Sequence, residues 1–107
     1  MNIYIANSLE EKIRGVEFLS EKEFENACMV FTDVGESAYF NMENVNYSIY
    51  IMALGQEDEI LDIGYMEPKT GKYRTPKGTK NVVEVGCNVM DKFQVGDIFY
   101  LQLKKID

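Results

Sequence analysis

The alternation of apolar and polar residues predicts a chain built mainly of short strands. Asn2–Ala6 alternates with a period of two, and the same period returns in Cys28–Thr32 and Ala38–Met42. Ser48–Leu54 is apolar on both faces, which is typical of a strand buried inside a sandwich or barrel. Three further segments are expected to form strands: Ile60–Met66, Asn81–Gly86 and Ile98–Lys104.

Helical signals are strongest near the N-terminus. Ser8 and Glu11 have the spacing of a capping box, which predicts a short helix over residues 9–14. The same spacing recurs before residues 21–26, where a helical turn is expected, and Asn88–Lys92 is predicted to form one more turn. The sequence therefore predicts a single domain, residues 1–107, that is mainly β. About seven short strands would form a partly closed barrel or sandwich with one short N-terminal helix.

The charge balance and the absence of histidine narrow the classes of function. The chain has 18 acidic and 11 basic residues, a net charge of −7, so general binding to nucleic acid or to an anionic membrane is not expected. Without histidine, catalysis by a Ser-His-Asp or Cys-His arrangement is ruled out. Cys28 and Cys87 are expected to be reduced and buried, because the chain has no signal-peptide pattern. We expect a cytoplasmic protein without a cofactor or a metal ion.

The segment Pro68–Lys80 contrasts with the rest of the chain because it has five basic residues and no acidic one. Most acidic residues precede it. The functional interpretation is a flexible basic loop presented to a phosphate, a nucleic acid or an acidic protein partner. The alternative is a solvated connection between strands that reduces the self-repulsion of an acidic domain. The candidate partner-binding residues are Lys69, Lys72, Tyr73, Arg74, Lys77 and Lys80.

Six short motifs follow one another in a specific order along the chain. They are Arg14-Gly15, Met29-Val30-Phe31, Phe40-Asn41-Met42-Glu43-Asn44, Pro68…Tyr73…Pro76, Val83-Glu84-Val85 and Val95-Gly96-Asp97. In this order the chain resembles domain-of-unknown-function family 192, which comprises small β-rich proteins of bacteria, archaea and some phages. The resemblance covers nearly the whole chain and implies a β-rich scaffold.

Three positions depart from the pattern of that family. Asn41 stands where the family usually has Trp, Glu43 where it has Lys, and Tyr50 where it tends to have Asp. The resemblance implies that a pocket shared by the family would be altered at these three positions. Because the family has no settled biochemical activity, the resemblance indicates a fold rather than a function. A divergent member of this kind is consistent with a phage or accessory-element protein.

Three classes of function remain open. The first expectation is a non-catalytic binding or interaction module. The second is a small-ligand-binding domain or an enzyme with a polar pocket around Arg14, Asn44, Glu84 and Asp97, in which Arg14 would hold a carboxylate or phosphate. The third is a structural or decoration protein of a larger assembly.

Each residue of the predicted polar pocket also has a purely structural interpretation. Arg14 would form a salt bridge on its helix, Asn44 would be a turn residue and Asp97 would cap a turn. Glu84 is expected on the same side of its strand as Val82, where it would face solvent or the rim of the sheet. Convergence of these side chains on one concave pocket would favour the ligand hypothesis, and their dispersal would exclude it.

Overall fold

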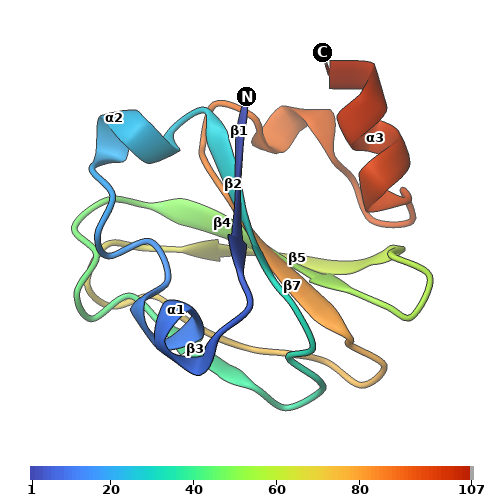
Figure 1. The fold of residues 1–107 in the computed structure, drawn as a ribbon, viewed down its shortest axis with the longest axis horizontal. Coiled ribbons are helices and arrows are strands. Elements are labelled where there is room, and N and C mark those ends of the chain that lie inside the picture. Colours follow the sequence, from blue (N-terminus) through green and yellow to red (C-terminus); the bar gives the residue numbers. More distant parts are fainter. Residues whose placement is uncertain (107) are drawn as a thin grey trace.

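The computed structural model describes residues 1–106 and is organised around one five-stranded sheet, the main sheet (Figure 1). Its strands, in spatial order, are β1 (Asn2–Ala6), β2 (Ala27–Phe31), β7 (Asn81–Val85), β4 (Ile49–Leu54) and β5 (Ile60–Met66). β1 runs parallel to β2, and all other neighbours in this sheet are antiparallel. β7 is thus the central strand, with two strands on either side.

A second, two-stranded sheet pairs β3 (Tyr39–Asn41) with β6 (Lys72–Arg74) in antiparallel register. Within residues 1–106, the strands form these two separate sheets rather than a closed barrel, while the prediction of a mainly β chain is confirmed. The basic segment Pro68–Lys80 is therefore not a continuous loop, because its middle part is β6.

The helices are short and begin where the sequence provides caps. They are α1 (Leu9–Arg14), α2 (Glu21–Phe24), the 3₁₀ turn η1 (Met90–Lys92) and α3 (Phe99–Ile106). The amide of Glu11 donates to the Ser8 hydroxyl at 3.1 Å, and the Ser8 amide donates to the Glu11 carboxylate at 3.0 Å. Ser20 and Glu23 form the same capping box before α2. The predicted helix over residues 9–14 and the turn after Ser20 are confirmed. In the described part of the chain, no helix is both long and apolar enough to traverse a bilayer.

The prediction of a strand over Ile98–Lys104 is wrong, because this segment forms α3 except for Ile98. Phe99, Leu103 and Ile106 recur at helical spacing and pack into the core on one side of the sheet. Ile98 alone keeps a strand-like contact, an isolated antiparallel bridge to Glu59. A short apolar run fits a strand or a helix equally well, and here the sheet had a face for a helix to cover.

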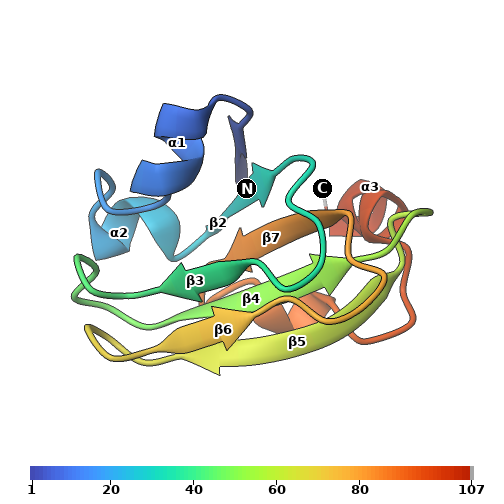
Figure 2. The same ribbon diagram turned by 90° about the horizontal axis from the view of Figure 1, so that it is seen from below.

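The two faces of the main sheet are covered by different elements. One face, which we call the first face, lies under α1, α2 and the β3–β6 sheet, and the second face lies under η1 and α3 (Figures 1 and 2). Along β7, Val82 packs into the core of the first face, whereas Val83 and Val85 pack into the core of the second face. Strands buried in this way are apolar on both sides, as predicted for Ser48–Leu54.

The two cysteines have different environments. Cys28 is buried in the core of the second face, and burial raises the pKa of its thiol to about 12. Cys87 is exposed, so the prediction that both thiols are buried is wrong for this residue. It directly follows Gly86, just beyond the end of β7, where the chain leaves the sheet. Both cysteines are free, as expected.

Candidate functional site

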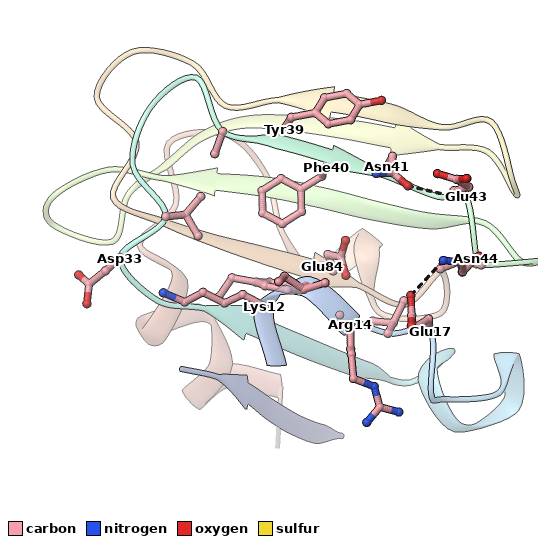
Figure 3. A pocket seen from close by; sticks show the side chains of 17 residues that line it. Lys12, Arg14, Glu17, Asp33, Tyr39, Phe40, Asn41, Glu43, Asn44 and Glu84 are labelled. Carbon is pink, nitrogen blue, oxygen red and sulfur yellow. Dashed lines mark hydrogen bonds between the residues drawn. The ribbon is translucent and has the colours of Figure 1, made fainter. Parts of the chain in front are cut away.

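A cavity of about 580 Å³ lies between α1, β3 and the first face of the main sheet (Figure 3). We call it the Glu84 cavity, after the carboxylic acid that β7 contributes to its wall. The other lining residues come from α1 and the loop after it, from β2 and β3 with their connection, and from the turn after β3. This volume is in the range of small-molecule binding sites.

Glu84 is buried in the centre of the main sheet, with only 4% of its surface exposed. Its neighbours across the strands are Met29 on β2 and Ile51 on β4, both apolar and buried. The prediction of a rim or solvent-facing carboxylate is therefore wrong. The alternation within β7 correctly places Glu84 on the side of Val82, but that side is an interior face because β7 is the central strand.

The Glu84 carboxyl group lacks the partners that a buried acid ordinarily has. Its Oε1 atom is buried and forms no hydrogen bond with any described residue. Burial disfavours the charged form and raises the pKa of Glu84 to about 8. An unsatisfied buried polar atom costs about 1–3 kcal/mol, so this group calls for an explanation beyond packing.

Gly15 keeps the space next to this carboxyl group open. It follows α1 with a φ of +52°, a conformation that L side chains rarely adopt. A Cβ atom at this position would lie 3.6 Å from Oε1 of Glu84 and 3.5 Å from Cζ of Phe31. A side chain here would therefore lie in van der Waals contact with the Glu84 carboxyl group, which in its absence remains part of the cavity wall.

Aromatic side chains form an apolar part of the Glu84 cavity. Phe31 on β2 and Phe40 on β3 pack edge to face, with ring centroids 5.3 Å apart. Figure 3 shows the Phe40 ring directed into the cavity. Both residues lie within the family-like motifs, but their sequence pattern does not predict a place in a site. Their common location depends on the position of β3 over the first face.

Arg14 and Asn44 also line the Glu84 cavity, as the pocket hypothesis requires. The Arg14 guanidinium lies over the Phe18 ring, 5.1 Å from its centroid, and points away from Glu84 (Figure 3). The Asn44 side-chain amide donates to the Glu17 carboxylate at 3.4 Å. Three of the four predicted pocket residues thus converge on one cavity, although only Glu84 presents an unpartnered group to it.

Asp97 does not belong to this constellation. Its carboxylate accepts a hydrogen bond from the Gln94 amide at 3.0 Å, and its carbonyl oxygen accepts one from the Ile60 amide at 2.8 Å. It therefore caps the turn before α3, outside the Glu84 cavity, which is the structural alternative considered from the sequence. Asp97 is part of a family-like motif, Val95-Gly96-Asp97, but this motif does not line the cavity.

Charged side chains of both signs line the Glu84 cavity in addition to Glu84. Glu17, Asp33 and Glu43 are acidic, while Lys12 and Arg14 are basic. The side chain of Lys12 extends towards the Asp33 side of the cavity, away from the turn that carries Asn44 (Figure 3). Acidic groups outnumber basic ones, so the electrostatic potential of the lining favours positive over negative charge.

The basic segment is anchored to the domain by its middle residues. Tyr73 is half-buried, and its hydroxyl donates to the Asp62 carboxylate at 2.8 Å; burial and this contact raise the pKa of Tyr73. Arg74 donates to the Ser37 carbonyl oxygen at 2.9 Å and lies over the Tyr39 ring. The basic residues of the segment are all exposed: Lys69, Lys72, Arg74, Lys77 and Lys80.

In the acidic hairpin between β4 and β5, a carboxylate forms a hydrogen bond with the backbone of the hairpin itself. The Glu59 carboxylate accepts a hydrogen bond from the Glu57 amide at 3.0 Å. In residues 1–106, no group of three or more Asp, Glu, Cys or His side chains is arranged to hold a metal ion.

Comparisons with known proteins inform the fold alone. No family model and no curated protein matches the sequence. A solved structure of a protein of unknown function from Novosphingobium aromaticivorans is similar, with a TM-score of 0.76 and 20% identity over 90% of this chain and 71% of that chain. A "putative transcription regulator" from Sinorhizobium meliloti has a TM-score of 0.73 and 16% identity over 90% of this chain and 78% of that chain. The chain shares their fold.

Proposed function

We propose that the protein is a non-catalytic binding module that holds a small molecule in the Glu84 cavity. The observation that carries this proposal is the buried Oε1 atom of Glu84, which has no hydrogen-bond partner and adjoins a cavity of about 580 Å³. A ligand with a suitable polar group would supply the missing partner. Polar groups at defined positions in a cavity wall fix the orientation of a ligand in small-molecule sites.

The position of Glu84 supports this proposal energetically. Leaving a carboxyl group between Met29 and Ile51 destabilises the fold, whereas an apolar side chain would pack there without loss. Polar groups that cost stability are characteristic of functional sites. Gly15 is consistent with this interpretation, because its lack of a side chain leaves the carboxyl group open to a ligand.

The test is to expose the ¹⁵N-labelled protein to a fragment collection that includes cations, anions and neutral molecules. Fragments that enter the Glu84 cavity should shift the backbone resonances of Gly15, Phe31 and Phe40 in two-dimensional NMR spectra. A collection that leaves these resonances unmoved would contradict the proposal.

A matched pair of variants separates the cavity from the rest of the surface. Val34→Trp places a large ring in the lining, whereas Val95→Trp makes the same change at a residue that is 59% exposed and outside the cavity. Fragment-induced shifts should disappear in the Val34 variant and persist in the Val95 variant. Shifts that survive Val34→Trp would place the binding elsewhere.

The exposed basic side chains favour a second candidate, the recognition of an acidic protein partner. Lys69, Lys72 and Lys77 extend from an anchored segment, so they present fixed positions to a partner. Their simultaneous replacement by Glu should abolish capture of such a partner, and binding by the wild type should weaken as salt rises. Identical capture profiles for wild type and triple variant at low and high salt would exclude this role.

The remaining sequence-based hypotheses stay predictions. They are membership of domain-of-unknown-function family 192, a phage or accessory-element origin, a cytoplasmic location, enzymatic use of the pocket and a structural role in a larger assembly. Identification of molecules that co-purify with the protein would address the ligand and assembly hypotheses together.

A further inference from the structure

The chemistry of the Glu84 cavity narrows the class of ligand, if the proposed small-molecule function holds. A ligand that reaches Oε1 of Glu84 must offer a hydrogen-bond donor to the carboxylate, or an acceptor to the neutral acid. The charges around the cavity distinguish these two possibilities from each other and from an anionic ligand.

The charged lining groups oppose an anion. Glu17, Asp33 and Glu43 surround the same space as Glu84, and the Arg14 guanidinium is directed over Phe18 instead of towards Glu84 (Figure 3). Lys12 is the one other basic group among the described lining residues. A ligand carboxylate or phosphate beside Glu84 would therefore meet more negative than positive charge.

The same geometry fits a small cation. Its positive end would pair with the Glu84 carboxyl group in the cavity wall, on the side where Gly15 lacks a side chain, and its apolar part would contact Phe31 and Phe40. Aromatic rings also attract cations through their faces. A charge-assisted hydrogen bond to a carboxylate is about twice as strong as a neutral one, and more so away from water.

We propose that the Glu84 cavity recognises a primary ammonium group on a compact apolar or aromatic molecule, with the ammonium paired to the Glu84 carboxylate. The proposal rests on the function proposed above and specifies its ligand class. No covalent bond forms or breaks in the ligand. The neutral acid gives its proton to the buffer as the ammonium enters, so that one ion pair replaces one carboxylic acid.

This exchange predicts a pH dependence of binding. Burial raises the pKa of Glu84 to about 8 in the free protein, so an ammonium ligand must displace a proton at neutral pH. The affinity should rise about tenfold from pH 6 to pH 7 and level off above about pH 8. A neutral ligand that accepts a hydrogen bond from the acid would show the opposite trend, with weaker binding as the pH rises.

Other titratable groups near Glu84 come from α1, from β3 and from the loops next to them. The acidic and basic ones are those of the cavity lining, and two phenols add to them. They are Lys12 and Arg14 from α1, Glu17 from the loop after it, Asp33 before β3, Tyr39 on β3, Glu43 after β3 and Tyr47 before β4, and Glu21 and Glu23 of α2 act on Tyr47 as well. The test must therefore include a variant of Glu84 itself.

The experiment compares three probes of similar shape: benzylamine, benzyl alcohol and benzoate. Each is titrated into the wild-type protein at pH 6, 7 and 8, and the dissociation constant is obtained from NMR shifts of the cavity residues. Benzylamine remains a cation over this range and should bind best at pH 8. In Glu84→Gln, its affinity should fall by about ten- to a hundredfold at pH 8 and lose its pH dependence.

Glu57→Gln is the matched control, because it removes the same charge from an exposed loop residue outside the cavity. It should keep the affinity and pH dependence of the wild type. Glu84→Met is a second variant that should fold and lose benzylamine binding, so misfolding of the amide variant would not leave the question open.

Three outcomes would contradict the proposal in different ways. Benzyl alcohol or benzoate binding more tightly than benzylamine at pH 8 would refute the ammonium ligand and leave small-molecule binding intact. If none of the probes or fragments shifts the resonances of the cavity residues, both the ammonium ligand and the proposed small-molecule function are refuted. Benzylamine binding that is equally strong in Glu84→Gln would also reject the ion pair.

Discussion

The two faces of the main sheet are covered by helices that bury very different amounts of their apolar surface. On the second face, Phe99 of α3 is buried and lies with its ring centroid 5.4 Å from that of Phe93. On the first face, α1 has no buried residue, and its Leu9 and Ile13 side chains are 75% and 73% exposed. The second face is closed by its helix, whereas the first face retains the Glu84 cavity.

This difference shows that covering a sheet and filling the space above it are separate properties. Both helices carry apolar residues at helical spacing, but those of α3 pack against the sheet and those of α1 remain largely exposed. The central strand contributes Val83 and Val85 to the core of the second face, whereas on the first face it contributes Glu84 next to Val82. The cavity and the carboxyl group therefore occur on the same face. Dense packing stabilises one face, and incomplete packing makes the other available to a ligand.

Removing the large ring that closes the second face should have the largest effect. Phe99→Ala should lower the free energy of unfolding by about 3–5 kcal/mol, because it leaves a void between α3 and the sheet. Urea denaturation measures the change. A loss of less than about 1 kcal/mol would mean that α3 is not an integral part of the core of the second face.

Making the first face resemble the second should stabilise the protein. The unfolded chain releases the Glu84 proton near pH 4.5, whereas the folded state holds it up to about pH 8, so wild-type stability should decline as the pH rises between these values. Glu84→Met removes this decline and should increase the unfolding free energy by about 3 kcal/mol at pH 7. Denaturation at pH 5, 7 and 8 tests the prediction. Parallel pH profiles for both proteins would argue against a strongly raised pKa of Glu84.

Placing a side chain at Gly15 should affect both the backbone and the cavity. Gly15→Ala should destabilise by about 1–3 kcal/mol, since a φ of +52° is strained for any residue with a side chain, although the added methyl group would fit beside Phe31 and Glu84. It should also weaken fragment binding next to Glu84. Thermal unfolding and NMR titration measure the two effects. Unchanged stability and binding would show that the conformation of this loop does not limit access to Glu84.

Removing the N-terminal cap of α1 should have the smallest effect, because this helix contributes no buried side chain. Ser8→Ala should lower stability by about 1 kcal/mol, the usual cost of losing such a cap. Faster amide hydrogen exchange confined to residues 9–14 should accompany it. A change as large as that of Phe99→Ala would contradict the distinction between the two helices.

Local patterns predicted the parts of the fold that depend on near neighbours in sequence. Ser8 and Glu11 cap α1 because their side chains reach each other's backbone amides within one helical turn. The alternation of the strands also placed the sides of β7 correctly, and the run Ser48–Leu54 was predicted to be buried on both faces. These features need no knowledge of distant segments.

Contacts between distant segments decided the rest, including the site. The run Ile98–Lys104 became a helix because the second face was free to receive Phe99 and Leu103. Arg14 and Asn44 line the same cavity as Glu84 because α1 and β3 lie over the first face. Asp97 lies outside the cavity, in the turn before α3.

The sequence by itself determined the β-rich class, the capped helices and the side of β7 on which Glu84 lies. Only the tertiary structure decided that this side is an interior one, because the burial of a strand depends on its neighbours in the sheet and on what covers them. An alternating strand is compatible with an exposed or an enclosed carboxylate. Segments far from Glu84 in the chain bury its carboxyl group, and this desolvation raises its pKa. The same segments form the cavity in which we propose that a ligand binds.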